Sequence, residues 1–160
     1  MTDMDRNLID LYEDGGRKLV KAIDGLTEAD RVSFPVPGTW SINQLVAHLT
    51  DCDLVFSDRM KRVIAEEKPT LTGFDESKWV EGLHYQSQSA PDLVALFDLN
   101  RRVMTNVLRL LPPEAFARTG THTDKGVQTV EDILRYAVNH LDHHLKFLYA
   151  KREALGKLMW

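Results

Sequence analysis

The sequence has a single cysteine, Cys52, among 160 residues, and one thiol cannot form an internal disulfide. This usage fits the reducing cytoplasm better than the secretory pathway, where small domains carry paired cysteines. The N-terminal segment MTDMDRNLID is polar and acidic, unlike the basic and then apolar start of a signal peptide. We therefore expect a cytoplasmic protein.

Long apolar runs and an excess of basic residues are also absent. No stretch approaches the roughly 20 apolar residues that a membrane-spanning helix requires, so no membrane association is expected. The formal net charge is −4, with both signs interspersed along the chain. Because a nucleic-acid-binding surface concentrates lysine and arginine, nucleic acid is not an expected partner.

The alternation of apolar and polar residues that marks half-buried strands is missing as well. Four segments instead carry apolar residues at helical spacing, and they predict helices at about 4–26, 41–67, 89–111 and 129–154. A single domain, 1–160, is the simplest organisation at this length. We predict an all-α, up-and-down four-helix bundle in which the second and fourth helices run parallel.

Local signals mark the starts of two helices and one long connection. Ser41 and Thr129 each stand three residues before a side chain that completes a capping box, which indicates a helix start at both places. Residues 68–88 join the second and third helices, with one short helical turn expected near 75–79. A connection this long inside a compact domain is more often functional than idle.

Three of the six histidines fall within NHLDHHLKF, residues 139–147. Successive helical residues are rotated by about 100°. This places His140 about 90° and His144 about 50° from the centre of the apolar stripe, whereas His143 lies about 150° away, toward solvent. His140 and His144 are one turn apart, the spacing at which two imidazoles can bind one ion.

A metal site that keeps an open position usually has three protein ligands. His48 is the candidate for the third, because it lies about 90° from the centre of the apolar stripe of the second helix and at a similar depth in the bundle. The alternative is a partly buried histidine without metal, beside a solvated pair at i, i+4. His84 and His122 lie in expected loops without a partner at defined spacing, so neither is included.

Two segments, GTWSINQLVAHLTDCD and then YAVNHLDHHLKFL, resemble the two motifs of the DinB/YfiT-like family of four-helix-bundle metalloenzymes. The connecting segment RRVIAEEKPTLTGFDESKW is also similar to many members, and the resemblance spans nearly the whole chain. It implies His48, His140 and His144 as ligands of a divalent transition metal, usually nickel or zinc. It further implies a small-molecule substrate and often a homodimer. Some relatives transfer low-molecular-weight thiols, and others are named metal-dependent hydrolases.

The chemistry of such a centre depends on what stands beside it. Three histidines and an open position allow an ion to activate either water or a thiol. Hydrolysis usually requires a carboxylate base, but Asp51, Asp75 and Glu76 are each expected to be solvated surface acids. Thiol S-transfer is therefore the favoured prediction. The alternatives are metal-dependent hydrolysis and a non-enzymatic, metal-binding dimeric bundle.

Other side chains near the motifs allow two interpretations each. Cys52 has the spacing of a fourth ligand, but its position within the apolar stripe favours a buried, inert thiol. The expected walls of a substrate pocket are aromatic: Trp40, Phe74, Trp79 and Tyr85. A packing contact at the entry of the second helix explains Trp40 equally well. The sequence names no catalytic residue.

Overall fold

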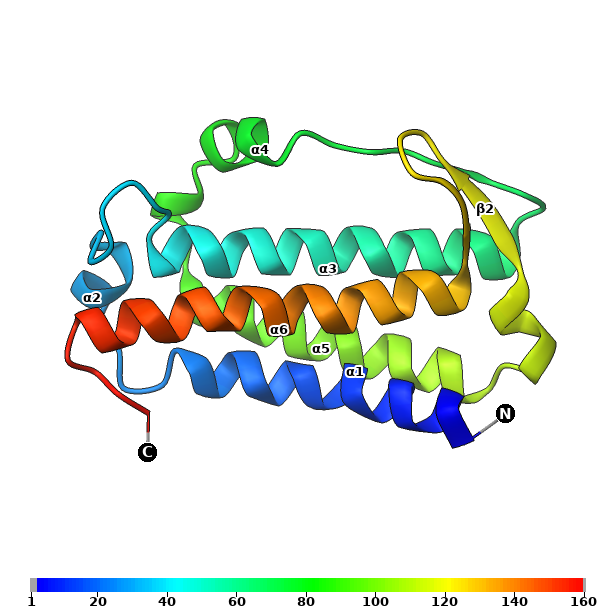
Figure 1. Ribbon diagram of the computed structural model, residues 1–160, viewed down its shortest axis with the longest axis horizontal. Coiled ribbons are helices and arrows are strands. Elements are labelled where there is room, and N and C mark those ends of the chain that lie inside the picture. Colours follow the sequence, from blue (N-terminus) through cyan, green and yellow to red (C-terminus); the bar gives the residue numbers. More distant parts are fainter. Residues whose placement is uncertain (1–2, 160) are drawn as a thin grey trace.

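The computed structural model describes residues 3–159, in which four long helices lie side by side as a bundle (Figure 1). They are α1 (Asp3–Ala22), α3 (Ile42–Ala65), α5 (Ala90–Arg109) and α6 (Val130–Ala154). The predicted four-helix bundle is confirmed, and so are the capping boxes that begin α3 and α6. The predicted ends differ most at α1, which stops at Ala22 because the chain turns through Gly25, with a φ of 72°.

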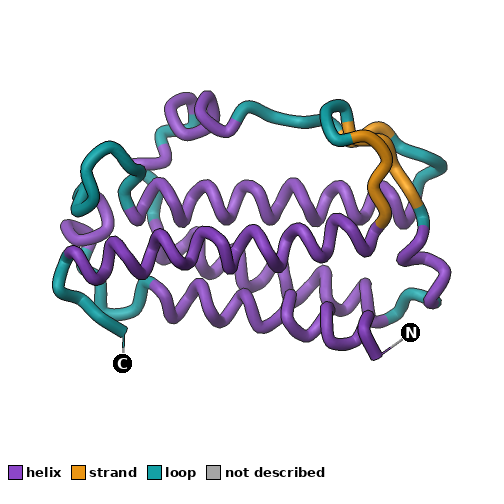
Figure 2. Tube along the Cα trace, in the orientation of Figure 1, coloured by secondary structure: helices purple, strands orange, loops and turns teal. Residues whose placement is uncertain are grey.

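Shorter elements occupy the connections, as Figure 2 shows: α2 (Glu28–Val32), β1 (Thr70–Leu71), α4 (Glu76–Gly82), η1 (Tyr85–Ser87), η2 (Pro113–Ala117), β2 (Thr119–His122) and β3 (Gly126–Thr129). The short turn of helix expected near residue 75 is confirmed as α4. The expected absence of strands is wrong, because β1 pairs parallel with β2 and β2 pairs antiparallel with β3. Strands of two to four residues are too short to show an alternating pattern. In the described part of the chain, no helix has the length and apolar character needed to cross a membrane.

Helices α3 and α6 run antiparallel, so the predicted parallel orientation is wrong. Thr39, just before α3, accepts a hydrogen bond from Lys151 near the end of α6, whereas Phe56, late in α3, contacts Tyr136, early in α6. The reason is the segment 66–89, called here the crossover, which returns along the outside of the bundle so that α5 starts at the same end as α3 (Figure 1). The helix direction therefore reverses from α1 to α3 and from α5 to α6, whereas α3 and α5 run parallel.

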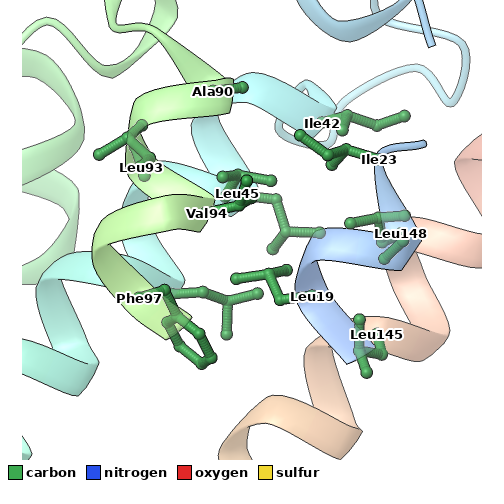
Figure 3. Close-up of a cluster of buried hydrophobic side chains, with 14 of the residues drawn as sticks. Leu19, Ile23, Ile42, Leu45, Ala90, Leu93, Val94, Phe97, Leu145 and Leu148 are labelled. Atoms are coloured by element: carbon green, nitrogen blue, oxygen red, sulfur yellow. The ribbon is translucent and has the colours of Figure 1, made fainter. Parts of the chain in front are cut away.

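The core is formed where all four helices face one another. Helices α1 and α3 each pack against both α5 and α6. Apolar side chains gather in two clusters along the bundle. Figure 3 shows one of them, in which side chains from the four helices come together: Leu19, Ile42, Leu45, Val94, Phe97, Leu145 and Leu148.

A buried ion pair crosses the middle of the bundle. Nε and Nη2 of Arg101, on α5, donate to Oδ1 of Asp53, on α3, at 3.0 and 2.8 Å. The same guanidinium donates to the main-chain oxygens of Tyr12, on α1, and Ala137, on α6. One side chain thus hydrogen-bonds to the other three long helices.

Gly15, in the middle of α1, leaves room for this guanidinium. A Cβ at Gly15 would lie 2.2 Å from Nη1 of Arg101 and 2.8 Å from Cδ2 of Leu141. Glycine inside a helix costs about 1 kcal/mol relative to alanine, but any side chain here would displace the arginine from its partners.

Replacing Asp53 with asparagine should destabilise the protein by about 3–5 kcal/mol, because Arg101 would keep its buried charge without a carboxylate. Asp58→Asn is the matched control: Asp58 also lies on α3 and pairs with an arginine, Arg62, at 2.7 Å, but both side chains are about half exposed. That change should cost less than about 1 kcal/mol. Urea denaturation followed by circular dichroism measures both, and equal losses would contradict the importance given to the buried pair.

Candidate metal centre

Three histidine side chains meet between α3 and α6. Nε2 of His48, on α3, lies 3.3 Å from Nε2 of His140, on α6. The ring centre of His144, one turn further along α6, lies 4.8 Å from that of His48 and 4.5 Å from that of His140. The structure therefore brings together the three histidines that the sequence motifs single out.

The helix phase calculated for α6 is confirmed. His140 and His144 are partly buried, and His143 is exposed. The His143 ring contacts the rings of His144 and Phe147 on its own helix, with 5.2 and 5.0 Å between ring centres. On α3, His48 is only 1% exposed, deeper than the flank position expected from the sequence.

Burial keeps these three histidines neutral at pH 7. It lowers the pKa of His48 from the ordinary 6.5 to about 4, that of His140 to about 3 and that of His144 to about 4. The neighbouring histidines lower the values of His140 and His144 further, because one charged ring disfavours another. Neutral rings offer a nitrogen lone pair, as metal ligands must.

The geometry of the cluster fits a divalent ion. Two nitrogen ligands on a tetrahedral ion, with bonds of about 2.0–2.1 Å, are separated by about 3.3 Å, and this is the distance between the Nε2 atoms of His48 and His140. Nδ1 of His144 is buried and has no hydrogen-bond partner. A buried polar atom without a partner costs roughly 1–3 kcal/mol, which a ligand would offset. His48 and His140 could therefore hold a metal together, and His144 stands beside them with an unpaired ring nitrogen.

Two further donors approach the same point. The ligand atoms of His48, His140, Cys52 and Glu76 all lie within 4.8 Å of one another. Sγ of Cys52 lies 3.6 Å from Nδ1 of His48, and burial raises the pKa of this thiol, so it stays protonated. Glu76 is exposed, as expected of a surface acid. The crossover nevertheless brings its carboxylate to the histidines, which no sequence pattern could show.

Trp40 lies directly beside the histidines. Its ring centre is 5.0 Å from that of His48. It also lines a cavity of about 290 Å³ that reaches His144. The other residues around this cavity are Gly38, Thr39, Leu45, Phe147 and Lys151. Lys151 was not singled out from the sequence, although its position seven residues after His144 places both on one helix face.

Phe74 and Trp79 belong to the crossover and contact each other, with ring centres 4.3 Å apart. Phe74 lines a second, smaller cavity of about 110 Å³, which also contains Cys52 and Glu76. Trp79 packs against the apolar core and lines a more distant cavity together with Phe74. Phe74 and Trp79 therefore line cavities that contain none of the three clustered histidines, whereas Trp40 lines the one that reaches His144.

Tyr85 is part of the buried core rather than of either cavity next to the histidines. Its hydroxyl donates to Oδ2 of Asp51 at 2.5 Å. Burial and this hydrogen bond raise the pKa of Tyr85, so the proton stays on the phenol. Asp51, one turn after His48, thus accepts a hydrogen bond that fixes the end of the crossover to α3.

The two histidines left out on sequence grounds do not belong to the group of clustered ligand atoms. His84 is exposed and has a left-handed backbone conformation, with a φ of 51°. His122, on β2, accepts hydrogen bonds at Nδ1 from the main-chain N–H groups of Asp124 and Lys125. It lines the 110 Å³ cavity together with Glu76.

The chain is similar to known proteins over most of its length. Residues 11–148 match the family model described as DinB superfamily. The chain is 28% identical over 149 residues to "Putative metal-dependent hydrolase YfiT" of Bacillus subtilis, across 92% of this chain and 84% of that protein. It is 30% identical over 108 residues to a "Putative metal-dependent hydrolase" of Oceanobacillus iheyensis, across 68% of this chain and 62% of that protein.

A solved structure also matches this chain over most of its length. YfiT from Bacillus subtilis, described as "a probable metal-dependent hydrolase with an unusual four-helix bundle topology", matches with a TM-score of 0.89 at 26% identity. The match covers 98% of this chain and 90% of that one. Agreement of this extent requires the same course of the four helices in both proteins.

The neutral histidines should make the metal-free protein sensitive to acid. Their folded pKa values of about 3 to about 4 lie below the 6.5 of the unfolded chain, so the unfolded chain takes up protons first as the pH falls. Stability is therefore intact above pH 6.5. It falls between pH 6.5 and about 3, by up to about 1.4 kcal/mol per pH unit for each group.

Urea denaturation with a chelator present, between pH 7 and pH 5, measures this loss. His48→Leu removes one of the three groups and should give a shallower dependence on pH. His143→Leu removes an exposed histidine, the smallest of the causes that act on His140 and His144, and should change the dependence much less than His48→Leu does. The same slope in His48→Leu and wild type would contradict the cause assigned here.

Proposed function

Because the chain belongs to the DinB superfamily, which it matches over residues 11–148, we propose that it is a metal-dependent hydrolase of a small molecule. His48, His140 and His144 are the proposed ligands, and Glu76 is the proposed general base. The observation that carries the proposal is the Glu76 carboxylate, within 4.8 Å of the His48 and His140 nitrogens. The names of the relatives in Bacillus subtilis and Oceanobacillus iheyensis support the same reaction class.

The histidines supply a neutral donor set of the kind that transition metals prefer to calcium or magnesium. When bound, a divalent ion such as nickel or zinc would supply a positive charge that makes a water or a thiol easier to deprotonate at neutral pH. Because three uncharged ligands leave that charge uncompensated, this donor set favours strong activation. Burial of His48 excludes bulk solvent from one side of the cluster.

Glu76 supplies what hydrolysis needs from the protein. It is the first residue of α4, and the side chain of Asp75 caps this helix by accepting the main-chain N–H of Lys78. The backbone under Glu76 is thereby fixed while its side chain stays exposed. A carboxylate at this place can accept a proton from a water beside the histidines and return it to the leaving group.

Thiol S-transfer, the reaction favoured from the sequence, is the second candidate. It was favoured because no carboxylate could be placed beside the histidines, and the position of Glu76 removes that reason. The thiol of Cys52 supports it, since Sγ already packs 3.6 Å from the His48 ring and so a sulfur atom is compatible with these neighbours. The two reactions differ in their need for a base, and this difference can be tested.

Metal content tests the proposed ligands. Replacing His48, His140 or His144 with alanine removes one of three ligands, so each variant should lose most of its nickel or zinc. His143→Ala should keep the metal and alter the free energy of unfolding by no more than about 0.5 kcal/mol, the range for exposed sites. Elemental analysis of protein purified without a metal-affinity column gives the stoichiometry. Full metal content in His140→Ala would rule out the three-histidine site.

Replacing Glu76 with glutamine tests the reaction. The variant keeps the size of the side chain but cannot accept the proton, so hydrolysis of ester or amide substrates should fall about 10²–10⁴-fold. Conjugation of a small thiol to an electrophile should change little. Glu81→Gln, an exposed glutamate on the same helix, is the control for both assays. Unchanged hydrolysis in Glu76→Gln would remove Glu76 from the mechanism, and thiol conjugation as the sole activity would replace the hydrolase assignment.

A further inference from the structure

Lys151 is buried in an unusual way for a lysine. It is only 3% exposed, although lysine is almost never fully buried unless it is paired. Its Nζ donates to Oγ1 of Thr39. Within residues 6–159, no carboxylate lies close enough to form an ion pair with it. Lys151 therefore carries a buried ammonium group without a counter-charge from the described protein.

A buried ammonium group is unfavourable unless other groups accept its hydrogen bonds or balance its charge. An ammonium has three N–H donors, and Thr39 accepts from one of them, while its own hydroxyl donates to the main-chain oxygen of Val36. Burial lowers the pKa of Lys151, with no charged neighbour that acts in the opposite direction. The protein thus holds a cation with unused donors in a place of low polarity, where an anion would be bound strongly.

The surroundings of Lys151 indicate what the anion is attached to. Lys151 lines the 290 Å³ cavity, whose remaining side walls are the apolar Trp40, Leu45 and Phe147. His144 lines the same cavity. It stands seven residues before Lys151 on α6, so the two positions are separated by about 10 Å along the helix axis. The cavity therefore has the candidate metal centre at one end, a buried cation at the other and apolar walls between them.

We propose that this cavity is the substrate-binding pocket and that Lys151 binds the carboxylate of an amphipathic substrate. The substrate has a compact apolar body, which packs between Trp40 and Phe147, and a carboxylate at the end far from the reacting bond. The orientation follows from the two ends of the cavity, because the carboxylate at Lys151 points the reacting group toward His144. This inference rests on the proposed function for the reaction, but the binding of the carboxylate requires no metal.

A purely structural role for Lys151 makes a different prediction. Through Thr39 the ammonium ties the segment before α3 to the end of α6, and a tie alone would not distinguish charged from neutral ligands. The preference for a carboxylate over a neutral isostere is therefore the property to measure.

The experiment uses 4-phenylbutyrate and its amide, two probes of nearly the same size and shape that differ in charge. Binding to the full-length chain is measured by calorimetry, both with zinc and after removal of metal by a chelator. We expect the wild type to bind the carboxylate at least tenfold more tightly than the amide in both states. The chelated sample excludes a bond between the carboxylate and zinc as the source. Equal binding of the two probes by the wild type overturns the proposal, whatever the variants do.

Three substitutions on α6, two of them at Lys151, locate the source of the preference. Lys151→Met removes the charge but keeps an apolar chain of similar length, and should bring the two affinities within about twofold. Lys146→Met removes the charge of an exposed lysine on the same helix and should keep the wild-type ratio. Lys151→Arg keeps a cation at the site and should keep most of the preference. A preference that survives in folded Lys151→Met overturns the proposal, because another group must then bind the carboxylate.

The result of this binding experiment can be distinguished from the result of a test of the proposed hydrolase activity. If the metal-loaded protein shows no hydrolysis of any ester or amide but keeps the preference for 4-phenylbutyrate, the hydrolase proposal fails and the carboxylate site is supported. If hydrolysis is found but the two probes bind equally, the reaction stands and Lys151 has no role in substrate recognition.

Discussion

The hydrogen bonds of the Arg101 guanidinium determine how the four helices are placed along one another. This group holds α3 through Asp53 and α6 through the main-chain oxygen of Ala137. Asp53 stands five residues after His48, and Ala137 stands three residues before His140. The same bonds therefore set the relative height of the two helices that carry the histidines. An ion pair in the core is weak evidence for stability, but here it gives the two helices one register in which the rings meet.

The crossover is the second constraint, and it links the topology to the candidate metal centre. A short loop after α3 would have made α5 antiparallel to α3 and left the outer side of α3 without cover. Instead, 66–89 runs back along α3 and is fixed at its far end by Asn43, whose amide donates to the main-chain oxygens of Tyr85 and Gln88. Because α4 lies on this return path, Glu76 is held over the histidines. One long connection thus produces the parallel pair of helices and also brings the carboxylate to the site.

The sequence predicts what depends on neighbouring residues in the chain, and it fails where a contact depends on the path of a loop. Helix ends, caps and the outward direction of His143 follow from spacing within one helix. The cluster of His140 with its partner on α3 was expected for a wrong reason, namely parallel helices. The two histidines still meet because His140 lies near the middle of α6, where reversing the direction of the helix shifts its position along the bundle by only a few residues. Glu76 and Lys151 could not be identified as site residues from the sequence. The contacts that distinguish each of them form only when a segment distant in sequence packs against it.

The separation of the site's residues along the chain has a consequence for how the protein is made. His48 and His140 are 92 residues apart in sequence, and the pairing of β1 with β2 joins residues 70–71 to 121–122. Contacts of this range slow folding relative to a bundle built from neighbouring hairpins. On the ribosome, α3 emerges long before α6, so a nascent chain exposes His48 without its partners. The three histidines therefore come together only after α6 has been synthesised and docked.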